Sequence, residues 1–195
     1  DYATSGATAL AYLRGLIDDG SMSEAVTNYT QEDARTQFIT GKSAMMINGP
    51  WELATLTKDA KFDWDVAPLP KDKRAATSMG GENVVVMNGA KQSDAAVKLA
   101  KFLTSAEGAK IYCDGSGQLS SRPDLQGKLK LSNDAKLKVF ESQLADAHAR
   151  AYGKDYPKIS EAIQLSMQEA LTGASTPEAA AKKAADSINP LLPKK

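Results

Sequence analysis

The residues of this sequence with the clearest chemical potential are two glutamates and a tryptophan. Glu52 and Glu82 could act as the paired carboxylates of a glycoside-cleaving enzyme, since such enzymes place two carboxyl groups across the sugar bond. Trp51 follows a Gly-Pro turn, and its indole offers an apolar face on which the C–H face of a sugar can stack. A single tryptophan is also a common core residue. The sequence alone leaves both interpretations of Trp51 open.

A pair of glycines forms the second unusual feature. The segment MGGEN at 79–83 places Gly80, Gly81 and Glu82 directly before a run of valines. Because glycine has no Cβ atom, the backbone here can approach a ligand closely or cross between two lobes, although a plain turn is an equal alternative. Beside an aromatic platform, such a segment fits sugar recognition, since sugar hydroxyls need carboxylate, amide and backbone partners.

Other kinds of site find little support in the sequence. His148 is the single histidine and Cys113 the single cysteine, so a zinc site and an internal disulfide are not expected. His148 is expected on the exposed side of a helix over 146–150. The GSG stretch at 115–117 lacks the flanking residues of a phosphate loop or a serine-hydrolase turn. We therefore expect neither a cofactor nor a metal.

The composition is that of an ordinary globular protein of 195 residues, enough for one good-sized domain or two small ones. Lysine plus arginine equals aspartate plus glutamate at 24 each, so no basic field invites nucleic acid. No apolar run approaches the ~20 residues that a membrane-spanning helix needs.

The hydrophobic pattern predicts an α/β or α+β protein with more helix than strand. Apolar runs bounded by turn residues predict buried strands at 43–47, 62–66 and 83–87. Apolar residues at helical spacing, with capping residues and glycine stops, predict an opening helix through Leu10 and Ile17 that ends near Gly20. The same signals predict further helices over 32–39, from 51, from 93 with Ser93 as its cap, from 105 with Ser105 as its cap, around 137–144, over 159–171, and from 177 with Thr176 as its cap. Trp51 would then lie between the end of the 43–47 strand and the start of the next helix. This is the edge of the sheet at which open α/β folds bind ligands.

The order of these pieces resembles a known family. The stretch GKSAMMINGPW at 41–51 resembles the "GkaAM.i.GpW" signature of the extracellular (family 1) carbohydrate-binding proteins of ABC importers, the maltose-binding-protein-like group. Further similar pieces follow in the expected order: VAPLP at 66–70, the glycine pair before a strand, the 95–108 helices, QLSSRPD at 118–124, YPKIS at 156–160 and the closing helices from 170. Together they cover nearly the whole chain.

The resemblance implies a type II periplasmic-binding-protein-like fold, represented here by its C-terminal half. Residues 1–79 and 121–195 are expected to form the C-terminal lobe. Residues 80–120 are expected to be a crossing segment, a strand and two helices that normally belong to the N-terminal lobe. With that lobe missing, the 83–87 strand would expose an apolar edge. A lipid anchor on the missing part is one expectation.

In that family the aromatic residue after Gly-Pro stacks on the sugar, which implies this role for Trp51. The crossing at Gly80, Gly81 and Glu82 would lie beside the ligand. The helix beginning near Tyr156 would add Ser160 and Gln164, where maltose-binding relatives carry Trp and Arg, so the particular sugar is left open.

The resemblance thus implies a non-catalytic substrate-binding component located outside the cytoplasmic membrane, in the periplasm or as a surface lipoprotein. Its partners would be a carbohydrate and the permease subunits of the importer. Two alternatives stay open: a glycoside-acting enzyme using Glu52 and Glu82, or a helical interaction module in which Trp51 belongs to the core.

Overall fold

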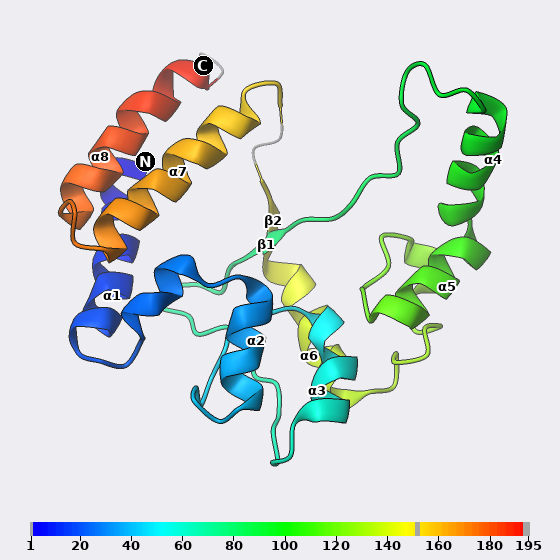
Figure 1. Ribbon diagram of the computed structural model, residues 1–195, viewed down its shortest axis with the longest axis horizontal. Coiled ribbons are helices and arrows are strands. Elements are labelled where there is room, and N and C mark those ends of the chain that lie inside the picture. Colours follow the sequence, from blue (N-terminus) through cyan, green and yellow to red (C-terminus); the bar gives the residue numbers. More distant parts are fainter. Residues whose placement is uncertain (1, 151–152, 193–195) are drawn as a thin grey trace. The chain divides into compact units, whose positions relative to one another are not determined.

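The computed structural model describes residues 2–150 and 153–192 of the chain (Figure 1). Contacts between residues divide the chain into two compact units. The first unit is formed by Asp1–Glu32 together with Ala151–Lys195, and the second by Asp33–Arg150. The first unit therefore joins the two ends of the chain, and the second is the continuous segment between them.

The first unit is helical throughout its described elements. These are η1, a π-helix (Tyr2–Gly6), α1 (Ala7–Asp18), the short 3-10 helix η2 (Glu24–Asn28), α7 (Tyr156–Leu171), α8 (Pro177–Ile188) and the 3-10 helix η6 (Asn189–Leu191). Helices α7 and α8 lie side by side (Figure 1), and α1 and η1 pack against α8.

Small side chains let these helices approach closely. One buried cluster joins α1 to α7 and α8, and a second joins α7 to α8; their members are Ala7, Leu10, Ala170, Ala180 and Ala181, and Ile159, Ala184 and Ile188. The partly buried ring of Tyr2 packs against both clusters. Because α8 supplies mostly alanines to this core, its backbone can lie close to its neighbours, which increases the number of van der Waals contacts.

Polar contacts fix the register of the same helices. The hydroxyls of Tyr2 and Ser166 share a hydrogen bond of 2.8 Å, and Arg14 donates to the carbonyl oxygen of Leu171 at 2.8 Å. The Leu171 carbonyl lies in the last turn of α7, where backbone acceptors lack helical partners. Arg14 thus connects α1 to the end of α7.

The second unit contains more irregular backbone. Its described elements are α2 (Gln31–Ile39), which begins at the boundary, the 3-10 helix η3 (Pro50–Glu52), α3 (Leu53–Asp59), β1 (Thr77–Met79), α4 (Ser93–Leu103), α5 (Ala106–Ser116), η4 (Pro123–Leu125), α6 (Ala135–Gln143), η5 (Leu144–Asp146) and β2 (Ala147–Ala149). β1 and β2 form a parallel pair in which Thr77 lies opposite Ala147 and Met79 opposite Ala149.

The three predicted strands at 43–47, 62–66 and 83–87 are wrong for this structure. None of them forms a strand in the part of the chain that the structure describes, and the two strands present lie at 77–79 and 147–149. The same correction applies to His148, which was predicted in a helix and lies in β2 opposite Ser78.

The reason is that a strand needs a partner for its backbone N–H and C=O groups, and an apolar run does not supply one. The apolar side chains of two of these segments are exposed instead of buried: Met45, Ile47, Val85 and Met87 expose 84%, 76%, 71% and 74% of their surface. The expected exposed strand edge at 83–87 is therefore replaced by irregular backbone with exposed apolar side chains.

Most predicted helices are confirmed, and so are most of their caps. Ser105 accepts a hydrogen bond from the backbone N–H of Gly108, and Thr176 accepts one from that of Ala179. The cap at Ser93 is wrong, because Ser93 is the first helical residue and Gln92 precedes it without a capping side-chain bond.

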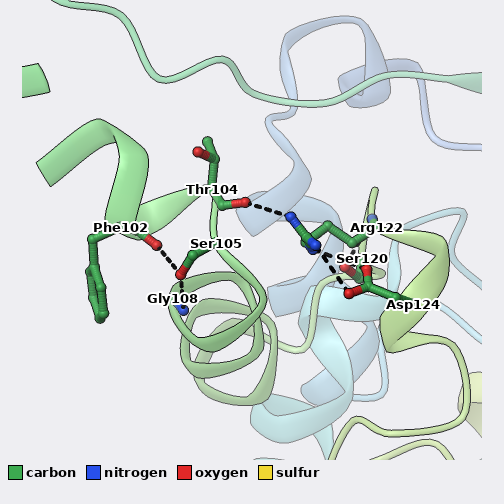
Figure 2. A network of polar contacts seen from close by, with 7 residues as sticks. All are labelled: Phe102, Thr104, Ser105, Gly108, Ser120, Arg122 and Asp124. Carbon is green, nitrogen blue, oxygen red and sulfur yellow. Dashed lines mark hydrogen bonds and ion pairs between the residues drawn. The ribbon is translucent and has the colours of Figure 1, made fainter. Parts of the chain in front are cut away.

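The turn between α4 and α5 is held by the loop that follows α5 (Figure 2). Ser105 donates to the Phe102 carbonyl at 2.7 Å while its oxygen caps α5. Arg122 donates to the Thr104 carbonyl at 3.0 Å and pairs with both oxygens of Asp124 at 3.0 Å. This fork-like geometry is the strong form of an Arg–carboxylate contact, so Arg122 fixes the loop to the helical turn.

Asp114 provides a prediction for the pH dependence of stability. Its carboxylate accepts hydrogen bonds from Lys110 Nζ and from the backbone N–H of Lys130, both at 2.6 Å, and the pKa of Asp114 is lowered by these contacts, chiefly by that with Lys110. A lowered folded-state pKa adds stability above the unfolded value of about 3.9, and this contribution is lost as the pH falls through the folded-state pKa.

We therefore expect Asp114→Asn to destabilise the protein at pH 7 and to do so progressively less as the pH falls below about 4. Urea unfolding at a series of pH values measures this difference. Asp63→Asn, at an exposed carboxylate, controls for the change in net charge. A difference between wild type and Asp114→Asn that does not vary with pH would contradict the assignment.

Candidate functional site

Trp51 lies on the surface of the second unit, in a short helix that its sequence dictates. Gly49 is extended, with φ −117° and ψ 174°, and Pro50 occupies the first position of η3, where its missing N–H costs nothing. Trp51 exposes 37% of its surface, whereas its neighbours Glu52 and Leu53 expose 3% and 4%. The turn therefore leaves the indole partly exposed while it buries the two residues that follow.

The Trp51 indole folds back over its own turn. A Cβ atom placed on Gly49 would overlap three carbons at the outer edge of the six-membered ring, Cζ2, Cη2 and Cζ3. The ring thus rests on the bare backbone of Gly49. Gly49 itself is buried, and its N–H donates to the side-chain oxygen of Asn48 at 2.9 Å.

The backbone of this turn is held from two further sides. Glu52 is buried and accepts a hydrogen bond from Arg35 Nη1 of α2 at 3.1 Å. Gly117, which ends α5 with φ +72°, lies so close that a Cβ atom there would be 3.1 Å from the Pro50 carbonyl oxygen and 3.5 Å from Trp51 Cα. Elements α2 and α5 therefore both brace the segment that carries Trp51.

The glycine pair lies immediately after β1, in exposed backbone without regular secondary structure. Gly80, Gly81 and Glu82 are all exposed. A Cβ atom on Gly81 would meet nothing within 4 Å, whereas one on Gly80 would lie 3.0 Å from Arg150 Nη2. Gly81 is therefore open to solvent on this side, and the guanidinium of Arg150 lies against Gly80.

Arg150 is a candidate site residue that the sequence reasoning missed. It directly follows β2, as Gly80 follows β1, and the carboxyl ends of two parallel strands lie at the same edge. A guanidinium group carries five N–H donors and suits hydroxyl or carboxylate acceptors. The prediction of a helix over 146–150 concealed this placement, and no local signal in the sequence marks 147–149 as a strand.

The remaining predicted residues share one face of α7 in the first unit. Tyr156, Ser160 and Gln164 are spaced four residues apart, which places them above one another on the helix. Gln164 Nε2 donates to Ser160 Oγ at 2.9 Å, and Gln164 is exposed. The structure thus joins these three residues on one surface and places Trp51 and the 80–82 segment on separate elements of the other unit.

A groove of about 330 Å³ lies between α7 and α8, and it contains none of the predicted sugar-binding residues. Its α7 lining includes Lys158, Ala162, Leu165 and Glu169. At 100° per residue these positions lie on the side of α7 away from Tyr156, Ser160 and Gln164. The groove is therefore a feature of helix packing, separate from the candidate site.

The described residues can also be compared with the metal-site, membrane-span and paired-carboxylate alternatives. Nowhere in 2–150 or 153–192 do three His, Cys, Asp or Glu side chains gather to hold a metal ion. Within the same residues, the structure has no helix long and apolar enough to cross a membrane. Glu52, one of the two carboxylates considered for glycoside hydrolysis, is buried against Arg35 while Glu82 is exposed.

Fold and sequence together define an extracellular solute-binding protein. The family model for bacterial extracellular solute-binding proteins matches residues 2–139, and the chain belongs to this family. The family is extracellular, which agrees with the extracytoplasmic location that the sequence resemblance implied.

Three known proteins illustrate what this chain is similar to. The chain is 27% identical to a binding protein of Brucella abortus over 98% of its length and 48% of that protein's. It is 33% identical to the maltooligosaccharide ABC transporter solute-binding lipoprotein of Streptococcus pneumoniae over 51% of this chain and 24% of that protein. Maltose-bound MalE3 of T. maritima matches with a TM-score of 0.82 and 31% identity, over 95% of this chain and 50% of that one.

These matches confirm the predicted periplasmic-binding-protein-like fold with more helix than strand. The chain spans about half the length of the Brucella and T. maritima proteins.

Proposed function

We propose that this chain forms the C-terminal half of the sugar-binding component of an ABC importer. The intact protein would bind a sugar or oligosaccharide between two lobes and deliver it to the permease subunits in the membrane. The observation that carries this proposal is the exposed Trp51 on its braced turn, in a chain whose structure matches a maltose-bound protein. The relative in S. pneumoniae is named for maltooligosaccharide, which supports an α-linked glucose oligomer as the class of ligand.

The lobes would be divided as the sequence suggested. Residues 1–79 and 121–195 would belong to the C-terminal lobe, and 80–120 would cross into the N-terminal lobe. The exposed apolar side chains of Val84, Val85, Val86 and Met87 support this division, because they would complete a sheet with the half of the relatives' length that this chain does not span.

Seven predicted residues and one added by the structure would form the sugar site. Trp51 would stack on the apolar face of a sugar ring, as indoles do with C–H groups. Backbone at Gly80 and Gly81, the carboxylate of Glu82 and the polar α7 face of Tyr156, Ser160 and Gln164 would serve the hydroxyls. Arg150 would add guanidinium donors beside Gly80.

The burial of Glu52, one of the two carboxylates considered for catalysis, favours a role in binding without catalysis. A glycosidase acid and its partner carboxylate must both reach the sugar, and Glu52 is buried against Arg35. The helical interaction module, in which Trp51 is core, is disfavoured because Trp51 exposes 37% of its surface. The relatives are named as binding proteins.

The direct test is calorimetric titration of the full-length protein with maltose, maltotriose and trehalose, followed by chromatography of the incubated sugars. Saturable binding with the sugars recovered intact is expected. Cleavage products would favour the enzyme alternative. The absence of binding to any of the oligosaccharides would refute the sugar-importer proposal.

Gly81 offers a test of the proposed crossing segment. Gly81→Val adds a branched side chain where the structure has open space, so the fold should tolerate it while a ligand approaching the backbone should not. We expect sugar affinity to fall roughly tenfold or more, the scale of one lost close contact, with an unchanged melting temperature. Gly115→Val, at an open position within α5, is the matched control for affinity. Equal sugar affinity in wild type and Gly81→Val would remove this residue from the site.

A further inference from the structure

The glycine beneath Trp51 has no conformational reason to be glycine. Gly49 has φ −117° and ψ 174°, an extended conformation that every L-residue adopts readily. Its backbone N–H and the Asn48 side chain form a local hydrogen bond that any residue other than proline could keep. What distinguishes the position is the space above it, because a Cβ atom would overlap the edge of the Trp51 ring.

Gly117 shows the contrasting case on the other side of the same turn. Its φ of +72° favours glycine for backbone reasons, and a Cβ atom would also crowd the Pro50 carbonyl oxygen at 3.1 Å. Gly117 therefore shapes the backbone, whereas the three atoms nearest to a Cβ atom on Gly49 all belong to the indole. The position of the turn thus depends on Gly117, and the position of the ring on that turn depends on Gly49.

From this geometry we propose that Gly49 is a positioning residue that seats the Trp51 indole in its sugar-binding orientation before the sugar arrives. The inference rests on the proposed function and names how that site is preorganised. The Arg35–Glu52 pair and Gly117 hold the backbone of η3, and the bare Gly49 backbone then fixes the ring. A ring that is already ordered loses less side-chain entropy when the sugar binds.

The chemistry of the ligand follows from this arrangement. A fixed, partly exposed aromatic ring selects a rigid partner with a flat apolar face, as the C–H face of a pyranose ring is. A flexible acyclic polyol would have to be ordered on the ring and would gain less from its preorganisation. The contact between Gly49 and the Trp51 ring thus predicts that the protein binds cyclic carbohydrates more tightly than acyclic ones with the same number of hydroxyls.

The first test uses the ligand-free protein. The background substitution Trp64→Phe removes the second of the two tryptophans in this sequence, so that the tryptophan signal of residues 1–195 comes from Trp51. In that background, Gly49→Ala should change the near-ultraviolet circular dichroism and lower the fluorescence anisotropy of Trp51, because the added methyl displaces the ring. Gly115→Ala, where a Cβ atom meets nothing within 4 Å, should leave both signals unchanged. An unchanged Trp51 signal in Gly49→Ala would overturn the proposal whether or not the protein binds sugar.

The second test is a double-mutant cycle on sugar affinity in the full-length protein, with maltose as the ligand. Gly49→Ala should weaken binding roughly two- to tenfold, the range of ordering one side chain. In a Trp51→Ala background the same change should have no further effect, because Gly49 acts only through the indole. An equal loss in both backgrounds would overturn the positioning role.

The two measurements distinguish their failures. If maltose does not bind the wild type, the proposed function fails, and the spectroscopic test still decides whether Gly49 seats the ring. If the sugar binds and Gly49→Ala changes neither the Trp51 spectroscopic signals nor the sugar affinity, the proposed function stands and the positioning role of Gly49 is refuted.

Discussion

Trp51→Ala is expected to weaken sugar binding by the full-length protein by roughly 1–3 kcal/mol, the scale of a well-packed aromatic contact at the centre of a binding site. The indole already lies on the surface with 37% of its area exposed. Its removal should therefore take away a ligand contact without opening a core cavity, and the melting temperature should stay close to that of the wild type. Calorimetric titration and thermal unfolding measure the two quantities separately.

The chain offers a matched control in its second tryptophan. Trp64 is partly buried, and Lys136 Nζ lies 4.9 Å from the centre of its ring, in a contact that belongs to the second unit's own packing. Trp64→Ala should lower stability and leave sugar affinity unchanged, the reverse of Trp51→Ala. If Trp51→Ala instead leaves affinity unchanged and lowers the melting temperature by many degrees, Trp51 is a core residue and the proposed site fails.

The helices of this fold could be predicted because their signals are local. The Thr176-Pro177-Glu178 start of α8 combines a capping hydroxyl, a proline at the first position and an acid in the first turn, and all three lie within three residues. Ser105 likewise caps α5 through the nearby backbone of Gly108. Each such signal needs no knowledge of the rest of the chain.

The strands could not be predicted, because their pairing is not local. The valine run at 84–86 has the composition of a buried strand, yet burial depends on a neighbouring strand that a composition cannot supply. Conversely, β1 and β2 are the short segments TSM and AHA, which carry little strand preference and lie 70 positions apart in register. Their pairing is a property of the whole unit.

In the candidate site, too, the features with local signals could be predicted and those that depend on distant residues could not. The outward position of Trp51 follows from the local Gly-Pro turn and was open to prediction. The brace beneath it was not, because Glu52 meets Arg35 across 17 residues and Pro50 meets Gly117 from a separate helix. Arg150 at Gly80 depends in turn on the strand pairing, so its place could be found only from the structure.

The Arg35–Glu52 pair gives the largest expected effect on stability. Glu52 exposes 3% of its side chain and Arg35 exposes 28%, with 3.1 Å between Nη1 and Oε2. Arg35→Met keeps a long side chain at this position and leaves the buried carboxylate without its partner. We expect the free energy of unfolding to fall by roughly 2–4 kcal/mol, slightly below the range for a fully buried pair because Arg35 is partly exposed.

Urea unfolding at pH 7 tests this expectation, and a double variant shows that the loss comes from the uncompensated charge. Arg35→Met combined with Glu52→Met removes both charges, and apolar replacement of a buried pair is often close to neutral, so the double variant should recover most of the lost stability. Lys182→Met is the control, because it breaks an ion pair with Asp186 in which the two side chains expose 69% and 63% of their surface. It should change the free energy of unfolding by no more than ~1 kcal/mol. A double variant as unstable as Arg35→Met alone would mean that the guanidinium stabilises η3 through packing, and the Trp51 turn would then owe its position to Gly117 more than to the buried ion pair.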